Sequence, residues 1–283
     1  MSSNYDVIDL ENINQNPYCN HGPTILFKNK DKLFYACSAC RDHKLCNFYL
    51  KYEEGKKISQ EKYDFWLDQF KSTLIPIEDQ NKKRKEIINS KNKRYCHNCN
   101  EFILNSESLK KHSDHFVLEK ITDEMLKKPL QNILNPIEKN SSNAQFVFDD
   151  QTNLFIQNHI KKFEYDSVLC IGTPSIFENL IDSNINLMLL DIDDRFMMFY
   201  DENRYQKFNM FNNYFFYDKK KYELFLAKAK NLLVIIDPPY GGMVKLISNT
   251  INTIMKDKED GNFSSPMGIR KNFPQALKIF YYD

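Results

Sequence analysis

Short apolar runs alternate with amphipathic segments through the second half of the chain. Three such runs cover residues 168–171, 186–190 and 232–236, and apolar runs of this length between polar or helix-breaking residues are typical of buried strands. Thr173 and Pro174, which follow the first run, form a common helix start. Strands that alternate with helices predict a parallel sheet with helices on its faces. We therefore expect an α/β fold here, with a further strand at residues 276–282.

Amphipathic patterns predict three more helices. Ser59 is a favourable N-cap for the first, and Asp149 or Asp150 can cap the second. The third follows Gly242. The expected core-facing residues are Tyr63, Trp66, Leu67 and Phe70 in the first helix, Leu154, Phe155, Ile160 and Phe163 in the second, and Met243, Leu246, Ile247, Ile251, Ile254 and Met255 in the third.

The chain has 283 residues, a net charge of +1 and seven cysteines, six of them before residue 100. The near-zero charge gives no overall field for a nucleic acid, so any basic surface must be local. No run approaches about 18 apolar residues and the N-terminus lacks a signal-peptide pattern, so we expect an intracellular protein that does not enter a membrane. In a reducing compartment, clustered cysteines indicate metal binding rather than disulfides.

The first cysteine group comprises Cys19-Asn20-His21, Cys37-Ser38-Ala39-Cys40 and Cys46. Four of its five ligand-type side chains can coordinate zinc tetrahedrally. One choice uses the C-x-x-C pair of Cys37 and Cys40. The group also resembles the GRF-type zinc finger, and that resemblance implies the ligands Cys19, His21, Cys37 and Cys46 in a module that binds single-stranded nucleic acid.

Aromatic and basic residues interleave in this first module, as base stacking and phosphate contact would require. Core packing around the metal is the alternative for at least half of the aromatic residues. The two sets are Phe27, Phe34, Tyr35, Phe48 and Tyr49, and Lys28, Lys30, Lys32, Arg41 and Lys44.

A second cysteine group follows a basic linker at residues 79–94. Cys96 and Cys99 are separated by twelve residues from His112 and His115, which is close to the two-Cys two-His zinc-finger pattern. We expect these four residues to hold a second zinc ion. Because one such finger reads only about three base pairs, we expect a scaffold or an RNA clamp rather than a reader of sequence.

The third apolar run ends in Asp237-Pro238-Pro239-Tyr240. Asp237 then lies at the carboxyl end of a strand, where open α/β sheets bind ligands. The prolines stiffen the turn, and Tyr240 offers a π face. The tetrapeptide resembles the D-P-P-[FYW] motif of S-adenosylmethionine-dependent amino methyltransferases. Such a site can position an adenine amino group by accepting its N–H groups at Asp237 and Pro238 while Tyr240 stacks on the base.

The residues after the first two strands suggest a cofactor site. Gly172 follows the first strand, where a backbone can approach a cofactor, although the full G-x-G-x-x-G pattern is absent. Asp191 stands nineteen residues later, at the end of the second strand, where an acidic residue can accept both ribose hydroxyls of an adenosyl cofactor. The aromatic stretch 208–216, which contains Asn209, falls where the adenine would be held; core packing is the alternative for its phenylalanines.

Taken together, these motifs resemble the eukaryotic CCHC-zinc-finger-containing N6-adenosine methyltransferases of large-subunit ribosomal RNA. The resemblance implies a Rossmann-like domain, S-adenosylmethionine as methyl donor, ribosomal RNA as substrate, and a nuclear or nucleolar setting with the cytoplasm as a further location. It implies cofactor contacts at Gln145, Phe146, Val147, Phe148, Thr173, Ser175, Asp191 and Asn209, and catalytic contacts at Asp237, Pro238, Pro239 and Tyr240.

Three features depart from that family. Its C-terminal CCHC knuckle is missing from these residues. A full methyltransferase sheet normally also adds an antiparallel hairpin, so either the fold is abbreviated here or the chain is truncated at its C-terminal end. Ser175 stands where the family tends to carry a basic residue, which leaves a carboxylate clamp there in doubt. Tyr240 stands where the family usually has Phe; both stack, so activity should survive.

The sequence therefore predicts an α/β protein in which two small zinc-binding modules precede a Rossmann-like methyltransferase domain. The expected order is a disordered tail (1–16), a GRF-type finger (17–57), a helix and basic linker (58–94), a two-Cys two-His finger (95–118), a connector (119–143) and the methyltransferase domain (144–283). We expect a monomer that binds RNA. The alternatives are a zinc-finger RNA-binding protein with an inactive methyltransferase fold, and a DNA adenine methyltransferase.

Overall fold

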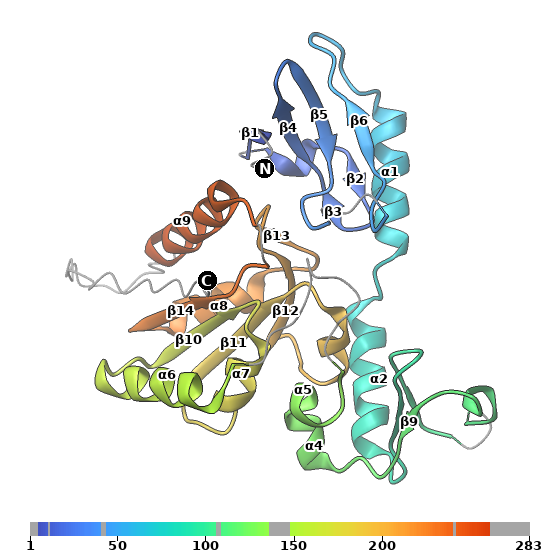
Figure 1. Ribbon diagram of the computed structural model, residues 1–283, viewed down its shortest axis with the longest axis vertical. Coiled ribbons are helices and arrows are strands. Elements are labelled where there is room, and N and C mark those ends of the chain that lie inside the picture. Colours follow the sequence, from blue (N-terminus) through green and yellow to red (C-terminus); the bar gives the residue numbers. More distant parts are fainter. Residues whose placement is uncertain are drawn as a thin grey trace. The chain divides into compact units, whose positions relative to one another are not determined.

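The computed structural model describes residues 5–10, 12–40, 44–105, 109–135, 148–239 and 242–260 (Figure 1). The chain divides into two compact units. The first comprises Met1–Ile75, Phe208–Phe216 and Pro238–Glu259, and the second comprises Pro76–Lys207, Tyr217–Asp237 and Asp260–Asp283. Within the described ranges, no helix combines the length and the apolar character needed to cross a membrane.

A five-stranded sheet confirms the predicted α/β fold. Its strand order is β13-β12-β11-β10-β14, parallel except for the β13 edge. The strands predicted at residues 168–171, 186–190 and 232–236 are present with nearly the expected ends, whereas β12 and β13 were not predicted. The further strand predicted at residues 276–282 lies outside the described residues. The strands are β10 (Ser167–Ile171), β11 (Asn186–Asp191), β12 (Tyr205–Asn209), β13 (Tyr214–Phe215) and β14 (Leu232–Ile236).

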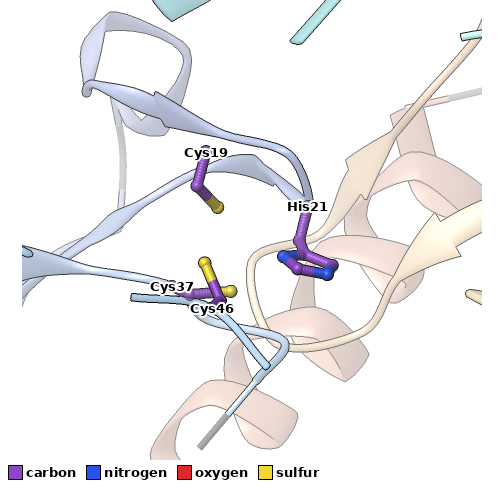
Figure 2. Close-up of side chains that lie close together, drawn as sticks. All are labelled: Cys19, His21, Cys37 and Cys46. Atoms are coloured by element: carbon purple, nitrogen blue, oxygen red, sulfur yellow. The ribbon is translucent and has the colours of Figure 1, made fainter. Parts of the chain in front are cut away.

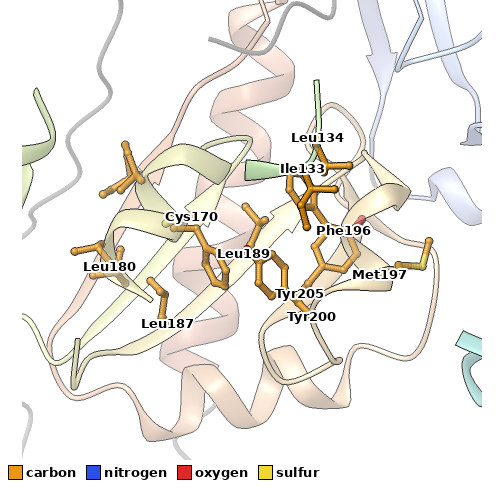
Figure 3. Packing of buried hydrophobic residues seen from close by; sticks show 14 of the residues in the cluster. Ile133, Leu134, Cys170, Leu180, Leu187, Leu189, Phe196, Met197, Tyr200 and Tyr205 are labelled. Carbon is orange, nitrogen blue, oxygen red and sulfur yellow. The ribbon is translucent and has the colours of Figure 1, made fainter. Parts of the chain in front are cut away.

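Helices and one apolar cluster complete the second unit. Thr173 and Pro174 start α7 as predicted, with Pro174 in its first turn. The cluster beneath the sheet includes Leu189 of β11 and Phe196, Tyr200 and Tyr205 after it (Figure 3). The helices are α2 (Ile77–Asn89), α4 (Asp123–Lys127), α5 (Pro129–Asn132), α6 (Asp150–Lys162), α7 (Pro174–Leu180), the 3-10 turn η3 (Asp194–Met198) and α8 (Lys220–Lys228).

Two parts of the second unit differ from the sequence-based expectation. The basic stretch expected to be a linker forms α2, whose Ile87 is buried. Asp149 caps α6 as predicted, but Leu154, Phe155 and Phe163 are about half exposed, at 57%, 50% and 47%. Ile160 is buried as predicted, together with Ile156, which was not predicted. Apolar residues lie all around α6, so its pattern could not specify which stripe the sheet would cover.

The second cysteine group belongs to a small antiparallel sheet of the second unit. Its strand order is β8-β7-β9, and a 3-10 turn carries the first histidine. The elements are β7 (Arg94–Cys96), β8 (Glu101–Ile103), η2 (Lys110–His112) and β9 (Val117–Leu118).

The first unit is built around a four-stranded antiparallel sheet of order β1-β4-β5-β6. Residues 5–9, expected to lie in a disordered tail, form its edge strand β1, because Val7 is buried opposite Phe27. The other strands are β2 (Tyr18–Cys19), β3 (Gly22–Pro23), β4 (Ile25–Asn29), β5 (Lys32–Ala36) and β6 (Tyr49–Lys51); β1 is Tyr5–Asp9.

Helices join distant parts of the chain within the first unit. They are η1 (Ile13–Gln15), α1 (Gln60–Ser72) and α9 (Val244–Asp260). Ser59 caps α1 by accepting from Lys62 N, as predicted. Phe70 of α1 is only 2% exposed and packs on Tyr18, Tyr214 and Phe216. Residues 208–216 therefore pack against the N-terminal part of the first unit, which carries Cys19, Cys37, Cys40 and Cys46 and is called the cysteine-bearing module below.

Candidate active site and metal clusters

Three predicted site residues lie at the carboxyl ends of neighbouring parallel strands. Ile171 of β10 pairs in register with Leu190 of β11 and with Ile236 of β14. The next residues are Gly172, Asp191 and Asp237, so all three stand at one edge of the sheet. Since neighbouring strands lie about 4.8 Å apart, the two aspartates flank Gly172 at a backbone separation of roughly 10 Å. This is the carboxyl edge at which parallel sheets bind ligands.

The backbone at this edge leaves the sheet in a defined way. Gly172 N donates to Leu190 O at 2.9 Å, and Asp237 N donates to Ile171 O at 3.0 Å. Gly172 has φ +64°, in the left-handed region where a side chain would be strained. The turn therefore needs glycine although the longer glycine pattern is absent.

Asp191 is buried and surrounded by its own loop. Its Oδ1 accepts from Asp193 N at 2.9 Å, and the residue is 8% exposed. Burial raises the pKa of the Asp191 carboxyl to about 7; repulsion from Asp193 adds to the rise and backbone N–H groups oppose it. The carboxylate is therefore desolvated and suited to accept hydroxyl groups.

The D-P-P-Y segment is described only in part. Asp237 is half-buried, and burial raises its pKa to about 6. Pro238 and Pro239 are also half-buried, and the Pro239 carbonyl accepts from Gly242 N at 2.9 Å. Tyr240 lies outside the described residues.

The other expected cofactor contacts separate into three groups. Thr173 and Ser175 are buried in the turn into α7, and Phe148 N donates to Ser175 Oγ at 3.5 Å. Gln145, Phe146 and Val147 lie outside the described residues. Asn209 belongs to the first unit.

Asn209 contacts the cysteine-bearing module. It is 1% exposed, its Nδ2 donates to Ser38 Oγ at 2.8 Å, and its Oδ1 accepts from Phe211 N at 3.0 Å. Ser38 stands between Cys37 and Cys40, so this amide links β12 to the first metal cluster. The cofactor role of Asn209 stays a prediction.

Cys19, His21, Cys37 and Cys46 come together in the first unit. One ligand atom from each lies within 4.8 Å of the others, and Figure 2 shows their side chains pointing into the same space. Gly22 makes the local turn possible, because its φ is +97° and an added Cβ would meet the Tyr214 ring at 3.1 Å. Three thiols and an imidazole are a donor set that suits zinc.

The surroundings of His21 support one nitrogen as the metal ligand. His21 Nε2 lies 3.5 Å from Cys40 Sγ. Its Nδ1 is buried and has no hydrogen-bond partner among the described residues. A metal ion would satisfy that atom, and Cys40 would then partner the opposite nitrogen rather than join the four.

Cys96, Cys99, His112 and His115 form a second cluster in the other unit. The Cys99 Sγ–His112 Nδ1, Cys96 Sγ–His115 Nδ1 and Cys99 Sγ–His115 Nδ1 distances are 3.6, 3.4 and 3.3 Å, and the two Nδ1 atoms are 3.2 Å apart. Tetrahedral zinc places S–N pairs about 3.5 Å and N–N pairs about 3.3 Å apart. His112 Nε2 lies 3.4 Å from Glu101 Oε1, the outer partner that fixes a ligating imidazole. The residues present fit zinc.

The aromatic residues of the first module serve different purposes. Phe34 stacks between Phe27 and Tyr49, with ring centroids 6.0 and 5.0 Å away, and Tyr5 meets it edge-on. Tyr49 is 52% and Tyr5 44% exposed. Phe48 packs on Trp66 instead. One face of the four-stranded sheet thus carries an aromatic row of Tyr5, Phe27, Phe34 and Tyr49, in which Tyr5 and Tyr49 are exposed and the two phenylalanines are partly buried.

Sequence comparison shows which known proteins this chain resembles. Residues 139–272 match a family model described as "Probable N6-adenine methyltransferase". The rRNA N(6)-adenosine-methyltransferase ZCCHC4 of Xenopus laevis is 33% identical over 287 residues, 92% of this chain and 58% of that protein. Across that length, the chain is similar in sequence to this ZCCHC4 protein. The ZCCHC4 proteins of Homo sapiens and Xenopus tropicalis are 32% and 35% identical over 87% and 84% of this chain.

The match covers only part of the length of the ZCCHC4 proteins. The chain spans 58%, 51% and 53% of the length of these three relatives. The residues that the family model matches, 139–272, include Gly172, Asp191 and Asp237. The resemblance inferred from the motifs is thus confirmed.

Sequence reasoning missed two residues that hold the loop after Asp191, Arg195 and Tyr205. Arg195 forms a buried ion pair with Asp193, with Nη2 and Oδ2 2.7 Å apart. The Tyr205 hydroxyl lies 3.1 Å from Asp191 O and 2.9 Å from Asp193 O. Only Arg195 left a signal, as a cation beside three acidic residues at a strand end; nothing local marks Tyr205.

Proposed function

We propose that this chain is an S-adenosylmethionine-dependent N6-adenosine methyltransferase that acts on large-subunit ribosomal RNA. One observation carries the proposal: Asp191 and Asp237 flank Gly172 at the carboxyl edge of one parallel sheet. The similarity to the rRNA N(6)-adenosine-methyltransferase ZCCHC4 proteins and to the N6-adenine methyltransferase family model supports it.

Each of the three edge residues has a role in this proposal. The Asp191 carboxylate accepts the ribose hydroxyls of the cofactor, and the Gly172 turn allows close backbone approach. When bound, S-adenosylmethionine supplies an electrophilic methyl group. Asp237 accepts an N–H of the adenine amino group, and the Pro238 carbonyl accepts the other. Because the amino lone pair is delocalised into the ring, the protein contributes chiefly by positioning that nitrogen.

The ionisation of Asp237 suits this role. With a pKa of about 6, its carboxyl group is mainly ionised at neutral pH and can accept an N–H bond. The amino proton leaves after the nitrogen has gained the methyl group, so no strong base is needed beforehand. Tyr240 would stack on the target adenine after that base has flipped out of the RNA stack.

The two clusters and the aromatic row would bind zinc and RNA. We assign one zinc ion to Cys19, His21, Cys37 and Cys46, and one to Cys96, Cys99, His112 and His115. The exposed rings of Tyr5 and Tyr49 give unpaired bases a surface for stacking. A monomer in the nucleus or nucleolus, with some protein in the cytoplasm, completes the proposal; imaging of a tagged full-length chain would test the location.

Substitution of Asp237 tests the catalytic assignment. Asp237→Ala should abolish methyl transfer to ribosomal RNA fragments while RNA affinity and zinc content stay near those of the wild type. Asp68→Ala is the matched control, because Asp68 is exposed on α1. Methylation is followed with radiolabelled cofactor. Substantial methylation by Asp237→Ala would remove Asp237 from the mechanism.

The same assay separates the other functions. Wild-type protein that prefers single-stranded DNA over RNA would be a DNA adenine methyltransferase. Folded, zinc-loaded protein that binds RNA but not S-adenosylmethionine would be a binding module with an inactive domain. Either result would overturn the proposal.

A further inference from the structure

We propose that the second metal cluster braces the loop that carries Asp191, so that metal binding at this cluster and cofactor binding at Asp191 strengthen each other. The inference rests on the proposed function, because it needs a cofactor at Asp191 and a metal at Cys96, Cys99, His112 and His115. All of the residues involved lie within the second compact unit.

The metal module shares a core with the sheet. Cys96 ends β7, and its neighbour Tyr95 points to the other side of the strand, where it is fully buried. The Tyr95 ring meets Phe102 at 5.3 Å, and Phe102 meets Phe199 at 5.5 Å. Tyr95 and Phe102 belong to the same apolar cluster as Leu189 of β11. The face of the module opposite its metal ligands thus belongs to the apolar core that packs against β11, the strand that ends at Asp191.

Phe199 is close in sequence to Asp191. The turn η3 (Asp194–Met198) lies between them, and its Phe196 and Met197 lie in the core shown in Figure 3. The loop from Asp191 to Phe199 therefore begins at the expected ribose contact and ends against the metal module.

Polar contacts make this loop one stiff piece. Asp191 Oδ1 accepts from Asp193 N, and the Tyr205 hydroxyl reaches the carbonyl groups of both residues. Arg195 donates from Nε to Asp193 Oδ1 and from Nη2 to Asp193 Oδ2. Its Nη1 donates to Asn135 O at 3.0 Å. The Arg195 and Asp193 side chains are 10% and 5% exposed. A shift of η3 would break buried charged contacts, so displacement at Phe199 is transmitted to Asp191.

Folding of the second metal module, and with it this packing, depends on the metal. The module has three short strands and a 3-10 turn, too little to fold without a metal or its neighbours. Loss of the metal loosens β7 and β8 and removes the packing of Tyr95 and Phe102 against the loop. Because coupling between two binding events is reciprocal, a bound cofactor must in turn hold the metal more tightly.

Metal release to a chelator at equilibrium tests this coupling in the unaltered full-length chain. The chain is loaded with cobalt, whose visible spectrum distinguishes three-thiolate from two-thiolate coordination. The share of cobalt released at equilibrium is measured at several chelator concentrations, with and without S-adenosylmethionine. We expect the cofactor to raise the cobalt affinity of the two-Cys two-His cluster about fivefold or more, while the cluster of the first unit, the internal control, keeps its affinity. Equal affinities at the second cluster with and without cofactor would overturn the inference.

A matched pair of variants provides the reciprocal test. Phe102→Ala should weaken S-adenosylmethionine binding at least about fivefold with two metals still bound. Phe116→Ala, at a residue of the same module that is 65% exposed and packs on His97, should leave affinity unchanged. Equal affinity in both variants would overturn the inference; the release experiment needs no variant and decides the matter if Phe102→Ala does not fold.

Failure of the inference differs from failure of the proposed function. If the wild type binds metal and cofactor independently, only the coupling is wrong. If it binds no cofactor, or no metal at the second cluster, the proposed function fails and the coupling with it.

Discussion

Lowering the pH should weaken cofactor binding through protonation of Asp191. Burial raises the pKa of this carboxyl to about 7, and only the ionised form can accept both ribose hydroxyls. As the pH falls through 7, an increasing share of the chain carries a protonated Asp191 and binds the cofactor poorly. The proposed role therefore predicts a pH dependence that an ordinary aspartate would not show in this range.

The size of the effect follows from the pKa. A carboxyl of pKa about 7 is roughly 90% ionised at pH 8 and about 3% ionised at pH 5.5, so the dissociation constant should rise about 30-fold. An aspartate with the usual pKa near 3.9 stays about 98% ionised at pH 5.5 and would change affinity hardly at all. The same shift lowers the stability of the cofactor-free chain as pH rises from about 4 to 7, because the folded state retains a proton that the unfolded chain releases.

Isothermal titration calorimetry with S-adenosylmethionine at several pH values measures this dependence. Asp191→Asn is the control, because the amide of the new side chain does not titrate and the variant keeps both Cys/His clusters. Zinc content is measured at each pH, since cysteine and histidine ligands also take up protons in acid. A pH-independent dissociation constant in the wild type, or an equal pH dependence in Asp191→Asn, would refute the role of Asp191.

Two further predictions concern the packing of the first unit. Phe70→Ala removes a ring that is 2% exposed and should lower the free energy of unfolding by about 3–5 kcal/mol. Phe65→Ala, at a 58% exposed site on the same helix, should change it by less than about 0.5 kcal/mol. Urea denaturation followed by circular dichroism measures both variants, and equal losses of stability would contradict the assigned packing. Ser38→Ala leaves the buried Asn209 amide without its 2.8 Å partner and should cost about 1–3 kcal/mol in the same assay; an unchanged unfolding midpoint would show that this hydrogen bond contributes little.

Local signals predicted much of the fold. The strands β10, β11 and β14 end near the expected residues because apolar runs between breakers are properties of the chain itself. Ser59 and Asp149 cap their helices for a similarly local reason, since a cap needs only a side-chain oxygen beside unpaired backbone N–H groups.

Other features depended on contacts between distant segments. Strand β12 carries polar residues in its pattern and is a strand because it pairs with β11. The edge strand β1 depends in the same way on β4. For α6, the apolar cluster that contains Ile156 and Ile160 decided which apolar stripe is buried.

By itself, the sequence determined the chemical groups and their order along the chain. Ligand-type residues at short spacings specify metal clusters, and an acidic residue after a buried strand must emerge at the strand's carboxyl end, so Asp191 and Asp237 could be chosen from the sequence. Only the tertiary structure decided what surrounds them. The pKa of Asp191, its link through Arg195 to Asn135, and the packing of Phe102 on Phe199 arise between segments far apart in sequence, where burial and pairing depend on how the whole chain folds.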